Sequence, residues 1–149
     1  MNHSIEELLV CVENLSPEDK ALITKAFNFS KQAHITQERN NGEPYFNHVF
    51  HVACILAKMD ADAVTISAGL MHDVLEDTDI KEEEMTKEFG DEIVFLVQGV
   101  TKLGHLKYKG VERHAESLRK FFIASAHDIR VVVIKLADRL HNIRTLQHL

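Results

Sequence analysis

The stretch DIRVVVIKLADRLHNIRTL, residues 128–146, decides the fold class of this chain. Its run of branched residues at 131–134 has the length of a buried β-strand. The apolar pattern continues at helical spacing well beyond strand length, at Leu136, Leu140, Ile143 and Leu146. The stretch therefore predicts a helix from residue 129 to about 147, with Asp128 capping its start.

Capping residues and apolar periodicity predict helices over most of the remaining chain. Ser4 with Glu7 forms a capping box, and Ser16 followed by Pro17 marks a second helix start. The predicted helices span residues 4–13, 16–34, 45–58, 62–75, 79–90, 91–101 and 111–126, with polar loops at 36–44 and 102–110. Because only 2 Pro and 6 Gly interrupt these patterns, we expect one all-α domain of about eight helices over residues 1–149.

Composition and charge exclude several classes of partner. The formal net charge is −6, so we expect no binding to nucleic acid. No apolar stretch approaches the ~20 residues that span a membrane, and the first residues do not resemble a signal peptide. Cys11 and Cys54 are expected to be free thiols. We therefore expect a cytoplasmic protein with a small-molecule partner.

Two imidazoles and two carboxylates stand out because they interrupt apolar segments. His48 lies in the predicted helix 45–58, and Asp138 lies in the C-terminal helix. The pair His72-Asp73 directly follows an apolar run. Burial of ionisable groups is costly unless they are paired or bound to metal, so this mixed set predicts a site for one divalent ion. The alternative is a buried ion pair, either Asp138 with an arginine or Asp73 with a histidine.

Two more carboxylates, Glu76 and Asp77, follow the His-Asp pair within one helical turn. In a continuous helix, His72 and Glu76 are i,i+4 neighbours. The same spacing relates Asp73 to Asp77, so the four groups are expected to share a broad face. Carboxylates beside a metal suit the hydrolysis of a phosphate ester or anhydride, although acids at a helix end also serve simply as solvated charge. Arg39, in the polar loop, is either a surface charge or a contact for phosphate or base.

Longer strings surround these residues: RNNGEPY at 39–45, GLMHDVLEDT at 69–78, GVTKL at 99–103 and IKLADRLHNIRTL at 134–146. Together they resemble the hydrolase domain of the RelA/SpoT proteins, a branch of the HD phosphohydrolase superfamily. The resemblance runs from about residue 26 to the end of the sequence. It implies a helical domain of the HD type that hydrolyses (p)ppGpp to GDP or GTP plus pyrophosphate, normally with Mn²⁺.

The resemblance also implies a role for each matching position. One Mn²⁺ per chain is expected to be held by His48, His72, Asp73 and Asp138. The attacking water is expected to be oriented and deprotonated by Glu76 and Asp77. The nucleotide substrate, ppGpp or pppGpp, is expected to contact Arg39 through its guanine and to lie against Asn41, Asn142 and Thr145.

Two residues depart from the family pattern near the expected site. Asn41 stands where the family usually has Ser, which changes one hydrogen-bonding group, and Val49 follows His48 in place of Pro. The sequence ends shortly after Thr145 without a synthetase domain, so we expect a hydrolase domain shortened at its C-terminus. The alternatives are a catalytically silent alarmone-binding or regulatory module, and a hydrolase of another 3′-phosphorylated nucleotide. The sequence leaves the oligomeric state open.

Overall fold

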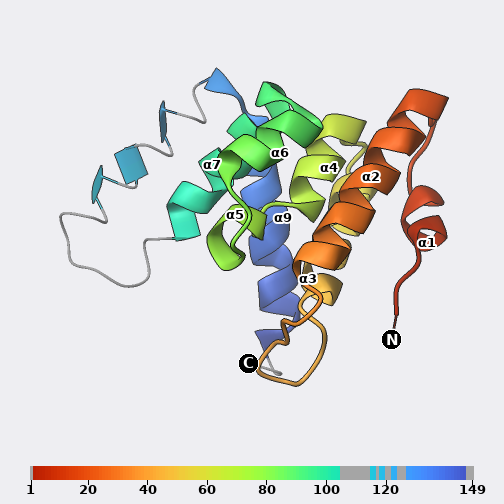
Figure 1. The fold of residues 1–149 in the computed structure, drawn as a ribbon, viewed down its shortest axis with the longest axis horizontal. Helices are drawn as coiled ribbons and strands as arrows, with labels where there is room; N and C mark the ends of the chain where they lie inside the picture. Colours follow the sequence, from red (N-terminus) through yellow and green to blue (C-terminus); the bar gives the residue numbers. More distant parts are fainter. Residues whose placement is uncertain (1, 105–114, 117, 120–121, 124–126, 147–149) are drawn as a thin grey trace.

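The computed structural model describes residues 2–104, 115–116, 118–119, 122–123 and 127–146. Its helices are α1 (Ile5–Leu9), α2 (Pro17–Ala33), α3 (Phe46–Lys58), α4 (Ala63–Leu70), α5 (Val74–Asp77), α6 (Glu82–Phe89), α7 (Asp91–Gly104) and α9 (Arg130–Arg144). Within these described ranges there is one isolated β-bridge, between Glu38 and Pro44, and no β-strand. The all-α prediction is therefore confirmed (Figure 1).

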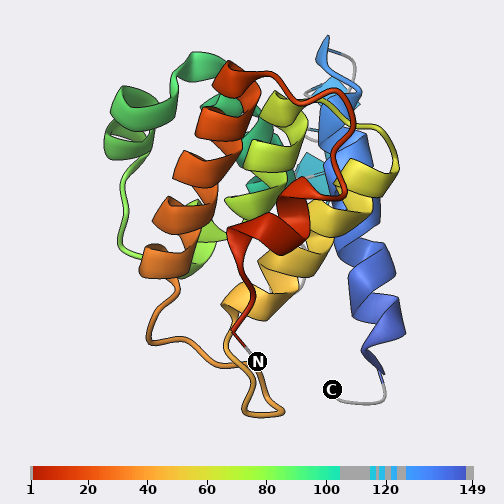
Figure 2. The same ribbon diagram turned by 90° about the vertical axis from the view of Figure 1, so that its right-hand side faces the viewer.

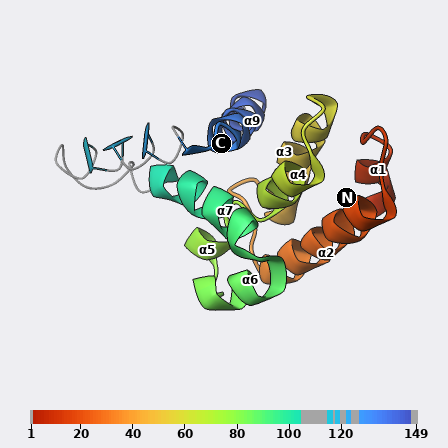
Figure 3. The ribbon, with the colours of Figure 1, turned by 90° about the horizontal axis from the view of Figure 1, so that it is seen from above.

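Helix α4 lies in the middle of the fold. It contacts α2 and α3, and also α7 and α9, so that every residue in it except Val64 is buried. Seen from above, α2 lies on one side of α4 while α7 and α9 lie on the other (Figure 3). Gly69 permits the close approach of α3, because a Cβ at this position would overlap the side chain of Leu56. The C-terminal end of α4 is thus held from several sides.

Local capping explains where the longer helices begin. The Ser16 side chain accepts a hydrogen bond from the backbone of Asp19 and Pro17 follows it, so α2 starts where the sequence predicts. Asp62 caps α4 by accepting from the backbone N–H of Thr65 at 2.8 Å. The segment 131–134 is helical, as predicted, and belongs to α9, which runs alongside α3 (Figure 2).

The prediction of one helix through residue 75 was wrong, because α4 ends at Leu70 and a turn separates it from α5. The His72 ring binds the backbone carbonyl of Gly69 at 2.7 Å, the group that an uninterrupted helix would offer to the N–H of Asp73. The carbonyl of Leu70 instead accepts a hydrogen bond from the Ser30 hydroxyl at 2.5 Å. The last two carbonyls of α4 therefore accept hydrogen bonds from side chains rather than from a further helical turn.

Three other predicted helices differ from the structure at one end or lie mostly outside the residues that it describes. Helix α1 ends at Leu9 rather than near residue 13, and α6 begins at Glu82 after Lys81, without the side-chain cap expected from residues 77–79. The predicted helix 111–126 lies mostly outside the described residues. Among the residues that are described, no helix is both long enough and apolar enough to cross a lipid bilayer.

Candidate metal centre

The turn after α4 fixes the orientation of His72. Its Nδ1–H donates to the carbonyl oxygen of Gly69 at 2.7 Å, which leaves the lone pair of the neutral ring on Nε2. That Nε2 atom is fully buried and forms no hydrogen bond with any described residue. The nearest acidic atoms are an oxygen of Asp73 at 3.1 Å and an oxygen of Asp138 at 3.6 Å. A buried, unsatisfied imidazole nitrogen facing two carboxylates is the donor that a divalent cation requires.

His48 approaches the same point from α3. Its Nε2 lies 3.0 Å from Asp138 Oδ1 and 3.7 Å from Asp73 Oδ2. The ring is buried, with 2 % of the residue surface exposed. Its other nitrogen, Nδ1, lies 2.8 Å from Nδ1 of His141 on α9. His48 therefore also directs Nε2 toward the two carboxylates.

The spacing of these donors fits a single cation. One ligand atom from each of His48, His72 and Asp138 lies within 4.8 Å of the others. Imidazole and carboxylate ligands bind such ions at about 2.0–2.2 Å, so two ligand atoms of one ion lie at most about 4.4 Å apart. The four separations between imidazole nitrogens and carboxylate oxygens, 3.0 to 3.7 Å, fall within that limit. The carboxylate of Asp73 reaches both rings and belongs to the same cluster.

The charges of the cluster call for a positive ion. Burial raises the pKa of the Asp73 carboxyl, but the neighbouring His72 and His48 rings outweigh it and hold that pKa well below its usual value. The pKa of Asp138 is lowered in the same way, with burial opposed by both rings. Burial lowers the pKa of His72, yet the two carboxylates raise it well above its usual value. Two ionised carboxylates thus attract either a proton or a divalent cation to the space between the rings.

Three residues outside the expected set of ligands, catalytic acids and nucleotide contacts support these ligands. The Tyr45 hydroxyl donates to Asp73 Oδ2 at 2.7 Å, and the Lys135 ammonium donates to Asp138 Oδ2 at 3.0 Å. The third is His141, the partner of His48. Lys135 and His141 stand three residues before and after Asp138 on α9, so the i,i+3 spacing was a usable signal. For Tyr45, three residues before His48, no comparable sequence pattern indicates a bond to Asp73.

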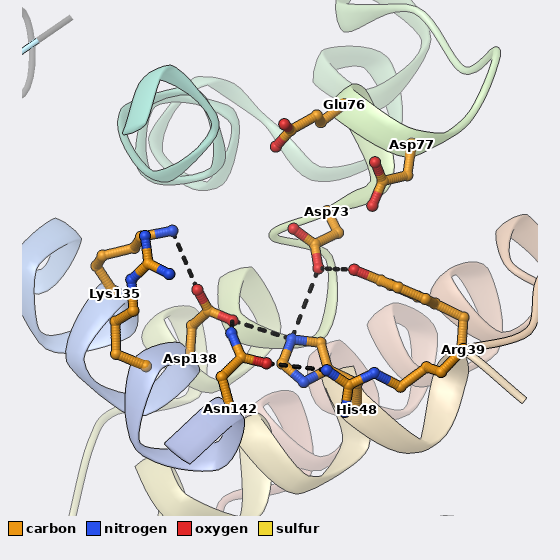
Figure 4. A pocket seen from close by; sticks show the side chains of 10 residues that line it. Arg39, His48, Asp73, Glu76, Asp77, Lys135, Asp138 and Asn142 are labelled. Carbon is orange, nitrogen blue, oxygen red and sulfur yellow. Dashed lines mark hydrogen bonds and ion pairs between the residues drawn. The ribbon is translucent and has the colours of Figure 1, made fainter. Parts of the chain in front are cut away.

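The cluster opens into a cavity of about 290 Å³ whose lining includes Tyr45, His48, Asp73 and Asp138. Glu76 and Asp77, both exposed, line it from α5. Figure 4 shows Asp73 between these two acids and the His48–Asp138 pair, with Glu76 and Asp77 on the opposite side of the opening. Partial burial and the negative charge of Asp73 raise the pKa of the Asp77 carboxyl, which favours proton transfer nearer to neutral pH.

Basic and amide groups form the other wall of the cavity. The Arg39 guanidinium donates to Asn142 Oδ1 at 2.9 Å and to Thr145 Oγ1 at 3.4 Å. The Asn142 amide in turn donates to Asp138 Oδ1 at 3.2 Å, which connects this wall to the cluster. Lys135 and Arg139 also line the cavity, so cationic side chains face an opening whose floor is acidic. Cationic side chains at this opening are suited to bind phosphate oxygens.

Two of the expected nucleotide contacts lie away from this cavity. The side chain of Asn41 accepts a hydrogen bond from the backbone N–H of Glu43 at 3.0 Å and so stabilises the turn at Gly42. Asn41 does not line the cavity. Thr145 does not line this cavity either, but its hydroxyl accepts a hydrogen bond from Arg39, which does. Thr145 lines a second, smaller cavity between α3 and α9.

An all-α domain that places two buried imidazoles, one buried carboxylate and one half-buried carboxylate beside an open, polar cavity has the arrangement of a metal-binding domain. Residues 26–149 match the HD domain family. The chain therefore belongs to the HD domain family, and its relatives place it in the RelA/SpoT branch.

Two curated bacterial relatives illustrate the likeness. The guanosine-3′,5′-bis(diphosphate) 3′-pyrophosphohydrolase of Aquifex aeolicus is 45% identical over 143 residues, which is 96% of this chain and 20% of that protein. The bifunctional (p)ppGpp synthase/hydrolase SpoT of Escherichia coli K12 is 45% identical over 143 residues, 95% of this chain and 20% of that protein. The chain thus spans about a fifth of the length of these relatives.

A solved structure is similar over most of both chains. It belongs to a metazoan orthologue of SpoT, described as hydrolysing ppGpp and acting in starvation responses. The two chains are 34% identical with a TM-score of 0.68, and the match covers 85% of this chain and 71% of that one. The similarity in sequence and in structure therefore reaches well beyond the short His-Asp motif.

Proposed function

We propose that this chain is a Mn²⁺-dependent (p)ppGpp 3′-pyrophosphohydrolase, which converts ppGpp or pppGpp to GDP or GTP and pyrophosphate. The observation that carries the proposal is the buried cluster of His48, His72 and Asp138, open to a cavity that also presents Glu76 and Asp77. The names of the bacterial relatives and of the metazoan orthologue support the choice of substrate. The free thiols Cys11 and Cys54 fit a reducing cytoplasm as the compartment.

The donor set determines which group would occupy the centre. His48 and His72 would each bind the cation through Nε2, while Asp73 and Asp138 would each bind through a carboxylate oxygen. Mixed imidazole and carboxylate donors suit a first-row divalent ion such as Mn²⁺. When bound, the ion supplies Lewis acidity for water and for the phosphate oxygens.

The remaining residues of the cavity carry the proton and orient the substrate. Glu76 and Asp77, which line the cavity, would accept a proton from the attacking water, and the raised pKa of Asp77 supports that role. The water adds to the phosphorus attached to the ribose 3′ oxygen, that P–O bond breaks, and the 3′ oxygen takes a proton as pyrophosphate leaves. Arg39 on the opposite wall would lie against the nucleotide, with Asn142 holding the guanidinium in place.

The direct test is hydrolysis by the purified chain. Incubation with Mn²⁺ and ppGpp is expected to yield GDP and pyrophosphate in equal amounts, resolved by anion-exchange chromatography. Chelation of the metal and the Asp73→Asn variant are both expected to stop the reaction. Tight ppGpp binding without turnover would instead indicate a silent alarmone-binding module. Faster turnover of another nucleotide carrying a 3′-phosphate would assign the same metal chemistry to a different substrate.

A further inference from the structure

Two buried rings, those of His48 on α3 and His141 on α9, share a hydrogen bond. Their Nδ1 atoms lie 2.8 Å apart, and His141 is only 8 % exposed. A hydrogen bond between two imidazole nitrogens requires one N–H donor and one lone pair, so one ring donates and the other accepts. The direction of this bond determines which nitrogen of His48 keeps an available lone pair.

The position of the metal centre determines which of the two rings donates this hydrogen bond. His48 Nε2 lies 3.0 Å from Asp138 Oδ1 and 3.7 Å from Asp73 Oδ2, on the side where the ligands converge. A nitrogen that binds a cation carries no proton, so the proton of the neutral His48 ring must be on Nδ1. It then points at His141 Nδ1, which must accept it. The proton of His141 is therefore on Nε2.

We propose that His141 is a positioning residue for the metal centre, accepting the Nδ1–H of His48 and so fixing the tautomer whose Nε2 faces the cation. The inference depends on the metal-dependent function proposed above. His72 offers a parallel within the same site, because its Nδ1–H donates to the carbonyl of Gly69 at 2.7 Å and its Nε2 also faces the carboxylates. One ring ligand is thus oriented by a backbone carbonyl and the other by a second imidazole.

The surroundings of His141 suit an acceptor held in a fixed orientation. Its ring stacks on that of His51, with ring centroids 5.1 Å apart and planes inclined by 16°. Because His141 follows Asp138 by three residues, the same face of α9 supplies a ligand and the group that orients another ligand. His141 also lines a cavity of about 210 Å³ between α3 and α9.

Nitrogen-15 NMR of the histidine side chains tests the tautomers without relying on activity. Zn²⁺ is the probe, because it is diamagnetic and accepts the same imidazole and carboxylate ligands. In the Zn²⁺-loaded chain, His48 is expected to be protonated on Nδ1 and His141 on Nε2. A spectrum that shows His141 protonated on Nδ1 would overturn the inference.

Matched substitutions test the effect on affinity, measured by calorimetric titration with Mn²⁺. His141→Phe keeps an aromatic ring against His51 but removes the acceptor, so affinity is expected to fall about 10- to 100-fold, as for other outer contacts of metal ligands. His141→Asn places an amide oxygen near the former Nδ1 and is expected to restore most of the affinity. His51→Phe, the control, keeps the stacked ring and is expected to bind like the parent.

The variants also separate this inference from the proposed function. His48→Ala is expected to abolish tight Mn²⁺ binding, and a variant that still binds tightly would refute the metal centre itself. If His48→Ala loses binding while His141→Phe retains it, only the role of His141 is refuted. Equal losses in the Phe and Asn variants would likewise refute it, because acceptor chemistry would then not matter. Thermal unfolding of each metal-free variant checks that the fold is intact.

Discussion

The two sides of the cavity differ in how deeply their side chains are buried. On the metal side, His72 is bonded to a backbone carbonyl, Asp73 to Tyr45 and Asp138 to Lys135, and all three lie at or near the buried core. On the opposite side, Glu76 and Asp77 are exposed on a helix of four residues. Affinity for the cation should therefore depend on buried contacts between distant segments, whereas proton transfer depends on an exposed local pair.

The largest effect is expected from removing a carboxylate on the metal side. Asp138→Asn keeps the shape of the side chain but removes the charge that faces both rings. We expect Mn²⁺ affinity to fall by more than the ~10- to 100-fold seen for outer contacts, and hydrolysis of ppGpp to be lost. Calorimetry and pyrophosphate release measure the two quantities. Parent-like Mn²⁺ affinity in this variant would remove Asp138 from the ligand set.

Substitution on the exposed side should separate catalysis from metal binding. We expect Glu76→Gln and Asp77→Asn to lower kcat by about 10²- to 10⁴-fold, the usual contribution of a general acid or base, with unchanged Mn²⁺ affinity. Asp79→Asn is the matched control, because Asp79 is an exposed acid two residues further on that does not line the cavity. If both variants lose Mn²⁺ as well, the contrast between the two sides is wrong.

Arg39 on the basic wall should affect the substrate rather than the metal. Arg39→Ala removes the guanidinium that Asn142 and Thr145 hold at the cavity. A hydrogen bond to a charged group contributes about 1.5–3 kcal/mol, so KM for ppGpp should rise about 10- to 100-fold. Arg39→Lys keeps the charge without the planar fork and is expected to recover only part of the loss. Steady-state kinetics at saturating Mn²⁺ measure KM for ppGpp in the parent and in both variants. An unchanged KM in Arg39→Ala would contradict a role for Arg39 in substrate binding.

A smaller effect, on stability, is expected from His34, whose ring lies beside that of Tyr45. Burial lowers its pKa, and the residue is only 1 % exposed. As the pH falls through about 6.5, His34 therefore becomes protonated in the unfolded chain but stays neutral in the folded chain. The free energy of unfolding then decreases by up to about 1.4 kcal/mol per pH unit. Above that pH the contribution is constant.

Urea unfolding of the metal-free chain at several pH values between 7.5 and 5 measures this dependence. His34→Gln is expected to reduce the slope, because the proton-binding difference is removed. His127→Gln, at an exposed histidine, serves as the control and should leave the slope as in the parent. An equal slope in all three chains would show that His34 is not held neutral by burial.

Helix positions were predictable from the sequence where local signals and packing agree. Ser16 and Pro17 mark the start of α2, and the long apolar period identifies α9 as a helix despite its run of branched residues. The break after Leu70 was not predictable, because it depends on the bond between the His72 ring and the carbonyl of Gly69. A side chain that competes for a backbone acceptor leaves no trace in hydrophobic periodicity.

The candidate site was likewise predictable from the sequence only in part. His48, His72, Asp73 and Asp138 could be selected because ionisable residues within apolar segments are unusual. Their convergence depends on α3 and α9 meeting beside the end of α4, which is a property of tertiary packing. Tyr45 and His141 escaped notice because their importance lies only in the ligands that they touch, Asp73 and His48 respectively.

The most direct test is to locate the cation itself. Crystals of the chain grown with Mn²⁺ and measured at the manganese absorption edge are predicted to show one anomalous peak. It should lie about 2 Å from Nε2 of His48, from Nε2 of His72, and from a carboxylate oxygen of Asp73 and of Asp138. A peak bound elsewhere on the chain, with these four side chains bonded only to one another, would contradict the proposed centre.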